Sequence, residues 1–167
     1  MNTNIKTNDA IIYSGSVHIQ YRYGKKTRHI NSRNKGELPL FTAIVFALGD
    51  QTDSAKSYAP RFIMAKNSDG ADCLTSKLLV QDRKYYNSAN MTTPVDGSVA
   101  DTIRYTFVVP AANMHQNKKI TKLQLINELN GVCAEIELDA GREINTDIGA
   151  NLLIYWDLTF ADSSQPE

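Results

Sequence analysis

Histidines and cysteines are the residues of this chain whose types could bind a metal ion or act as nucleophiles. His18, His29 and His115 lie in separate segments with no partner two or four positions away, and a metal site would need them to converge with Asp or Glu in space. Cys73 and Cys133 form no CxxC or other ligand spacing. We therefore predict solvated surface histidines, reduced thiols, and no metal ion or cofactor, with a disulfide as the less favoured alternative.

Oxygen-rich clusters give no stronger indication of a catalytic or metal site. Asn67, Asp69 and Asp72 surround a glycine, but the full ligand series and closing Glu of a calcium loop are missing, so we predict a turn. By alternation, Glu135 and Glu137 lie on the outer face of one strand, the usual place for solvated charge. The sequence has no nucleophile elbow and no phosphate-binding loop, which predicts a protein that is not an enzyme.

Charged residues are unevenly distributed along the chain, although the totals cancel at 18 basic and 18 acidic side chains. Residues 1–122 contain 17 of the basic and 9 of the acidic side chains, whereas residues 123–167 contain Arg142 and nine carboxylates. A subunit with a basic and an acidic region can dock head-to-tail on copies of itself or on a charged neighbour. Alternatively, the two regions lie side by side in the fold and neutralise each other.

Basic side chains gather most densely between residues 22 and 35, close to tyrosines and His29. Basic groups near aromatic rings can hold phosphates and stack bases. A dedicated nucleic-acid binder is normally basic overall, however, and the net charge here is +0, so we favour a surface that faces another protein. The predicted basic side of this interface is Arg22, Lys25, Lys26, Arg28, Arg33 and Lys35, and the predicted acidic side is Glu135, Glu137, Asp139, Glu143 and Asp147.

The elements that position these residues are predicted to be short strands. Residues 25–36 are polar and lack periodicity, which predicts a loop or an irregular strand. Trp156 aligns with the apolar face of the last strand, which places it in the core rather than in a sugar-binding platform. Alternation or short apolar runs between turn residues indicate strands at residues 17–23, 61–65, 103–109, 120–129, 132–138 and 151–160, and one or two strands within residues 73–86.

Asn130-Gly131 predicts a tight hairpin turn, because a type I′ turn needs a positive φ at both central residues. With these two residues as the loop, Leu125 lies opposite Ile136, and the apolar side chains of both strands share one face. The predicted hairpin therefore has a defined register as well as a defined turn.

One helix is predicted between Pro39, which suits a first helical turn, and Gly49, which suits the position after a helix end. The run between them is apolar on every side, which predicts a buried helix, with a short buried strand as the alternative. About 7–9 strands and one short buried helix predict a mainly β fold, either a β-sandwich or a jelly roll. We expect a single domain at 12–161 between a flexible arm at 1–11 and a flexible tail at 162–167, with no segment that crosses a membrane.

Four segments stand out together in this order along the chain. They are Asn34-Lys35-Gly36, the helix from Leu40-Phe41 to Ala47-Leu48-Gly49, the hairpin from Ile120 to Leu138, and Asn151-Leu152-Leu153-Ile154-Tyr155-Trp156. Together they resemble small β-rich structural proteins of tailed bacteriophages, which form collars, rings, tails and decorations in podovirus-like and crAss-like phages. The resemblance implies a non-enzymatic virion subunit present in many copies, made and assembled in the host bacterial cytoplasm.

The resemblance and the charge pattern lead to one hypothesis of function. The chain forms or joins a multi-copy ring at the head–tail neck or tail, through charge-complementary faces. Its expected partners are copies of itself and other virion structural proteins, and neither a membrane nor nucleic acid is expected. The alternative is a carbohydrate- or host-receptor-binding β-sandwich module, such as a fibre or capsid decoration, with Tyr85 and Tyr86 as glycan contacts.

Overall fold

Strands are the main secondary structure, as predicted. The computed structural model describes residues 11–23, 25–36, 38–96 and 100–162. Within these residues the helices are α1 (Leu38–Leu48) and α2 (Thr52–Tyr58), with single 3-10 turns at Ala111–Asn113 and Thr146–Ile148. The strands are β1 (Ile11–Tyr23), β2 (Lys26–Gly36), β3 (Phe62–Lys66), β4 (Leu78–Leu79), β5 (Asp82–Tyr86), β6 (Thr102–Val109), β7 (Lys119–Ile120), β8 (Lys122–Ile126), β9 (Val132–Glu137), β10 (Ile144–Asn145) and β11 (Leu152–Asp162).

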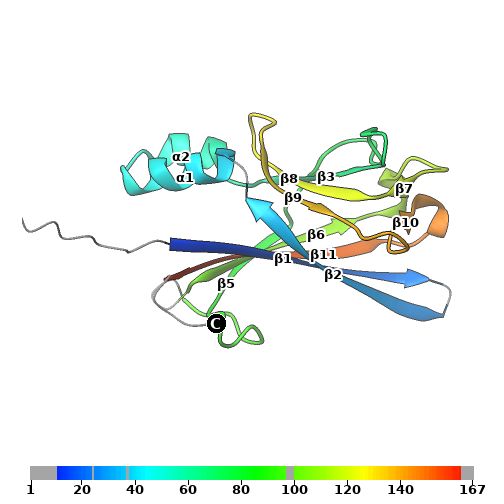
Figure 1. The fold of residues 1–167 in the computed structure, drawn as a ribbon, viewed down its shortest axis with the longest axis horizontal. Coiled ribbons are helices and arrows are strands. Elements are labelled where there is room, and N and C mark those ends of the chain that lie inside the picture. The colour runs from blue at the N-terminus through cyan, green and yellow to red at the C-terminus, as the bar shows by residue number, and fades with distance from the viewer. Residues whose placement is uncertain (1–10, 24, 37, 97–99, 163–167) are drawn as a thin grey trace, which may run out of the picture.

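Nine of these strands form one continuous sheet in the order β4-β3-β8-β9-β2-β1-β11-β6-β5, and β7 pairs with β10 beside it. β2 joins the two halves of the sheet, because it pairs with β1 through residues 26–34 and with β9 at Lys35 and Gly36. Before those two residues, which end the strand, β2 lies beside β1 and apart from β9 (Figure 1). The halves turn apolar side chains toward each other, so the mainly β, sandwich-like class is confirmed.

The core lies between the two halves of the sheet. Ile19, Phe107 and Trp156 contribute from β1, β6 and β11, and Ile63 and Leu125 contribute from β3 and β8; each is 0% exposed. Burying an aliphatic or aromatic side chain of this size stabilises a fold by about 1.5–3 kcal/mol. The predicted core position of Trp156 is confirmed.

Residues 26–36 form a regular strand, which corrects the prediction of a loop or an irregular strand. β2 makes nine consecutive residue pairs with β1, from Gly15↔Asn34 to Tyr23↔Lys26. Among the β2 side chains that the structure describes, only Ile30 is buried. Backbone pairing with β1 therefore holds the strand in place, and a strand that buries so little needs no apolar periodicity.

The β8–β9 hairpin forms, but with a different turn and register from those predicted. Asn130 has a φ of 62°, whereas Gly131 does not adopt a positive φ. The Asn127 N–H donates to the Gly131 carbonyl at 3.0 Å, and the Asn127 side-chain oxygen accepts from the Gly131 N–H at 2.7 Å. The loop therefore has three residues, as in a hairpin built on a type I turn, and Leu125 lies opposite Ala134 instead of Ile136.

The predicted helix is confirmed as α1, but it is more exposed than predicted and a second helix follows it. α1 packs against α2 and contacts β9, and Figure 1 shows both helices beside the β8–β9 hairpin. Leu40 and Ala43 are buried, whereas Phe41 is 42% exposed. The ring of Phe46 lies 5.5 Å from the ring of Tyr58 in α2. A helix that packs on one side only leaves part of its apolar surface exposed, and an all-apolar sequence does not show which side that is.

Candidate functional site

The predicted basic residues lie on the hairpin of β1 and β2, which we call the basic hairpin (residues 16–35). Figure 1 shows its far end extending away from the half of the sheet that contains β9. Arg33 is exposed farther along β2, and the side chain of Lys35 lies outside the described part of the chain. The exposed basic residues around the end of the hairpin are Arg22, Lys25, Lys26 and Arg28.

Two of the predicted acidic residues, Glu135 and Glu137 on β9, share a lysine of the neighbouring strand. The Lys122 Nζ lies 2.8 Å from an oxygen of Glu135 and 3.2 Å from an oxygen of Glu137. Burial alone would raise the pKa of Glu135, but hydrogen bonds donated by Lys122 and Gln124 outweigh burial and lower it. Hydrogen bonds to Glu135 and Glu137 raise the pKa of Lys122. Contacts within its own subunit therefore hold Glu135 in its charged form.

The remaining predicted acidic residues also have partners within the chain. Asp139 lies 3.6 Å from the Arg142 guanidinium, and Glu143 accepts a hydrogen bond from the Gly141 N–H at 2.9 Å. Asp147 accepts a hydrogen bond from the Asn117 N–H at 2.8 Å. Each of the five predicted acidic residues thus has at least one contact inside the subunit.

The basic and acidic regions of the sequence meet within one subunit, as the alternative interpretation of the charge pattern expected. Besides Lys122, Arg61 pairs with Glu128, and Arg104 pairs with Asp157 at 2.7 Å. Among the described residues, none of these ion pairs includes Lys25, Lys26 or Arg33. Lys25, Lys26 and Arg33 are all exposed, so the basic hairpin presents these charges to solvent.

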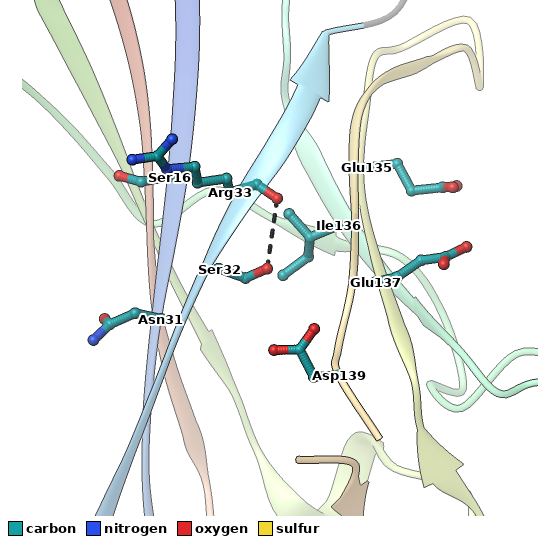
Figure 2. A pocket seen from close by; sticks show the side chains of 8 residues that line it. All are labelled: Ser16, Asn31, Ser32, Arg33, Glu135, Ile136, Glu137 and Asp139. Carbon is teal, nitrogen blue, oxygen red and sulfur yellow. Dashed lines mark hydrogen bonds between the residues drawn. The ribbon is translucent and has the colours of Figure 1, made fainter. Parts of the chain in front are cut away.

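A cleft of about 770 Å³ lies between β2 and β9, where the two strands diverge. Figure 2 shows Arg33 turned toward β1, and Glu135 and Glu137 turned away from the cleft on the opposite side. Ser32 and Ile136 point into it instead. The charges on the two walls do not face each other, so the cleft is not itself a charge-paired site. Its lining residues are Ser16, Asn31, Ser32, Arg33, Glu135, Ile136, Glu137 and Asp139.

Sequence reasoning missed an arrangement of planar side chains on the outer face of the sheet. The Arg104 guanidinium lies 4.9 Å from the Tyr86 ring centroid and 5.2 Å from that of Tyr155. Its Nε and Nη2 each donate to a carboxylate oxygen of Asp157 at 2.7 Å. Hydrogen bonding to Asp157 raises the pKa of Arg104, although burial opposes this. These residues come from β5, β6 and β11, so no fixed spacing along the chain could indicate them.

Two of the three histidines extend this arrangement, which corrects the prediction of separate solvated side chains. The His18 ring stacks on Tyr155 with centroids 6.2 Å apart and an interplanar angle of 20°. The His29 ring lies 5.2 Å from the His18 ring. The β1–β2 register brings them together, because His18 lies opposite Asn31 and Gln20 lies opposite His29. The sequence could have indicated this pair only once residues 25–36 were recognised as a strand paired with β1.

The two tyrosines proposed as glycan contacts lie in different environments. Tyr86 is 7% exposed and has the Arg104 guanidinium over its ring, so no sugar can stack on it, and we withdraw it as a contact. Tyr85 is 46% exposed. It lines a shallow cavity of about 320 Å³ together with Asp101 and Phe160. Burial would raise the pKa of Asp101, but hydrogen bonds from Ser88 and Thr102 outweigh it and lower the pKa.

The predicted turn and free thiols are confirmed. The Asn67 side chain accepts hydrogen bonds from the backbone N–H groups of Asp69 and Ala71, at 3.1 and 2.8 Å. Cys73 and Cys133 are both buried and free, and burial raises the pKa of Cys133 to about 12. In the part of the chain that the structure describes, no group of three or more His, Cys, Asp or Glu side chains is arranged to hold a metal ion.

Comparisons with known proteins give no relatives: no family model, no curated protein and no solved structure matches this chain. Within the described ranges, neither helix combines the length and apolar character needed to cross a membrane. The geometry of the basic hairpin and of the outer sheet face therefore carries the functional argument.

Proposed function

We propose that this protein is a non-enzymatic structural subunit of a tailed-phage virion, which docks on an acidic protein surface through its basic hairpin. The observation that supports this proposal most directly is the exposure of the basic side chains at the end of the hairpin. Residues 16–35 contain six basic and no acidic residues, so the hairpin presents charge of one sign. Such a surface attracts and orients an oppositely charged partner.

The favoured partner is another virion protein rather than a second copy of this chain. Glu135, Glu137 and Asp139 already pair with Lys122 and Arg142, so the hairpin of a second copy would have to share these three carboxylates with those partners. An exposed ion pair contributes about 0–1 kcal/mol, so a single hairpin would bind weakly. A ring at the head–tail neck or tail would repeat the contact in every subunit and add these small terms together.

Cross-linking mass spectrometry on purified particles, combined with light scattering on the isolated protein, tests the proposal. We expect cross-links from Lys25 or Lys26 to an acidic neighbour, and loss of incorporation for the double variant Lys25→Glu, Lys26→Glu. The matched control reverses two exposed lysines outside the hairpin, Lys56→Glu and Lys119→Glu, and should incorporate normally. In light scattering, any self-association should weaken at about 0.5 M salt, where charge screening shortens the Debye length to about 4 Å. Absence from particles, together with a monomer at low and high salt, would contradict the proposal.

A carbohydrate- or receptor-binding module is the second candidate, and the exposed Tyr85 supports it. An exposed aromatic ring beside a carboxylate, here Asp101, suits a sugar site because the ring can stack on a sugar and the carboxylate can accept hydrogen bonds from its hydroxyl groups. A glycan array identifies a ligand, and Tyr85→Ala should then abolish binding without changing stability. An array with no reproducible ligand would remove this candidate.

A further inference from the structure

The two histidines of the basic hairpin are close enough to act on one ligand. His18 Nε2 and His29 Nδ1 are 3.1 Å apart, and they belong to adjacent paired strands. His18 is half-buried beside Tyr155 and His29 is exposed, so the pair is open to solvent on one side. The strand pairing fixes both backbones, which holds the two rings near each other without a ligand.

Asn31 determines which nitrogen of His18 carries the proton. The Asn31 side-chain oxygen lies 2.5 Å from His18 Nδ1, and because an amide oxygen only accepts, His18 Nδ1 must donate. In the neutral ring Nε2 then holds a lone pair that faces His29. A hydrogen bond of this kind to the other ring nitrogen is how metal-binding histidines are usually oriented.

The separation of the two nitrogens suits a shared metal ion. With Zn–N bonds of about 2.0–2.1 Å, a 3.1 Å separation corresponds to an N–Zn–N angle of about 95–102°, between octahedral and tetrahedral values. We propose that His18 Nε2 and His29 Nδ1 form a two-histidine chelate for a divalent transition-metal ion. His29 moves its proton from Nδ1 to the solvent side at Nε2 when the ion binds, so no net proton is released from the neutral pair.

The chemistry of the pair selects the class of ion. Imidazole nitrogen suits Zn²⁺, Ni²⁺ and Cu²⁺, whereas Ca²⁺ and Mg²⁺ prefer oxygen ligands. Two protein ligands leave the other coordination positions to water or to a donor from a bound partner. The hairpin around the site is basic, which opposes cation binding, so we expect modest affinity. This inference does not depend on the proposed virion role, since it concerns the isolated chain.

Zinc titration of the tag-free protein tests the chelate, with ¹⁵N NMR of the imidazole nitrogens and calorimetry as readouts. We expect one ion per chain and shifts of His18 Nε2 and His29 Nδ1, with His115 unchanged. The His29→Ala variant should bind zinc at least about tenfold more weakly. In the native protein, an ion bound to His18 meets His29 at a high effective concentration, and the variant lacks this second ligand. The Asn31→Ala variant should bind up to about tenfold more weakly, because His18 loses its orienting partner.

The matched control is His115→Ala, which removes the third histidine and should leave zinc binding unchanged. His29 is exposed, so its replacement should not affect folding, and the NMR readout on the native chain needs no variant at all. No saturable binding up to about 1 mM zinc would overturn the proposal. Equal affinity in the native protein and His29→Ala, or shifts confined to His115, would also overturn it.

Discussion

Replacing Asp157 with alanine should destabilise the protein far more than removing an ordinary surface ion pair. Asp157 accepts two hydrogen bonds of 2.7 Å from Arg104, and the two side chains are only 13% and 22% exposed. Hydrogen bonds to charged groups contribute about 1.5–3 kcal/mol each, and an unpaired charge left partly buried adds a further cost. Arg104 keeps its contacts with Tyr86 and Tyr155 and some access to water, so we expect a net loss of about 2–3 kcal/mol.

Urea unfolding followed by tryptophan fluorescence measures this loss, because Trp156 is the single tryptophan, is 0% exposed, and adjoins Asp157 in β11. The expected loss corresponds to a fall in Tm of about 4–12 °C for a chain of this size. A double-mutant cycle with Arg104→Ala should give a coupling energy of about 1.5–3 kcal/mol.

The matched control for Asp157→Ala is Asp53→Ala in α2. Asp53 lies 3.6 Å from Lys56, but the two side chains are 99% and 77% exposed, so its loss should change stability by less than about 0.5 kcal/mol. If Asp157→Ala changes the free energy of unfolding no more than Asp53→Ala does, the reasoning about partial burial is refuted.

Three further predictions concern the core, a thiol and a carboxylate. Leu125→Ala should cost about 2.7–5 kcal/mol in urea unfolding because Leu125 is 0% exposed, whereas Leu129→Ala, at 58% exposure, should cost less than about 0.5 kcal/mol. Because the pKa of Cys133 is raised in the folded protein, its contribution to the free energy of unfolding is fully present below pH 9.0 and is lost as the pH rises toward about 12. Urea midpoints measured from about pH 8 to 10.5 should therefore fall less steeply for Cys133→Ala than for the native protein. Because the pKa of Glu135 is lowered in the folded protein, its contribution to the free energy of unfolding is present above pH 4.5 and is lost as the pH falls. Glu135→Gln should therefore lose less stability than the native protein between about pH 5 and 3, and an equal loss in the two proteins would contradict this.

The strands that bury one apolar face could be predicted from the sequence, and those held by backbone pairing could not. In β11, Ile154, Trp156 and Leu158 alternate on the core face, so period two indicates both the strand and its orientation. In β2 only Ile30 carries such a signal among the described side chains, and pairing with β1 decides the structure. The strand propensity of an isolated segment does not depend on the neighbouring strand with which it will pair in the fold, so it could not predict β2.

The basic residues of the candidate site could be predicted from the sequence, whereas the contacts between side chains of different strands could not. The clustering of basic residues is visible in the sequence, because they lie close together along one hairpin. The contact between His18 and His29, and the contact between Arg104 and Asp157, depend on strand register, which the sequence gives only where a turn fixes it. Even where Asn130-Gly131 predicted a two-residue turn, a three-residue loop forms instead. The buried Asn127 favours it, because its backbone and its side chain both hydrogen-bond to Gly131.

The position of β1 in the sheet has a consequence for how the chain is made. β1 pairs with β2 on one side and with β11 on the other, and more than 100 residues separate β1 from β11 in the sequence. At about 5–20 residues per second, a ribosome takes roughly 6–26 s to synthesise the intervening chain, and during that time one edge of β1 has no strand to cover it. Folding is therefore expected to be slow and to finish late in synthesis. A nascent chain that stops before residue 152 would leave β1 and β6 with open edges, and such edges promote aggregation.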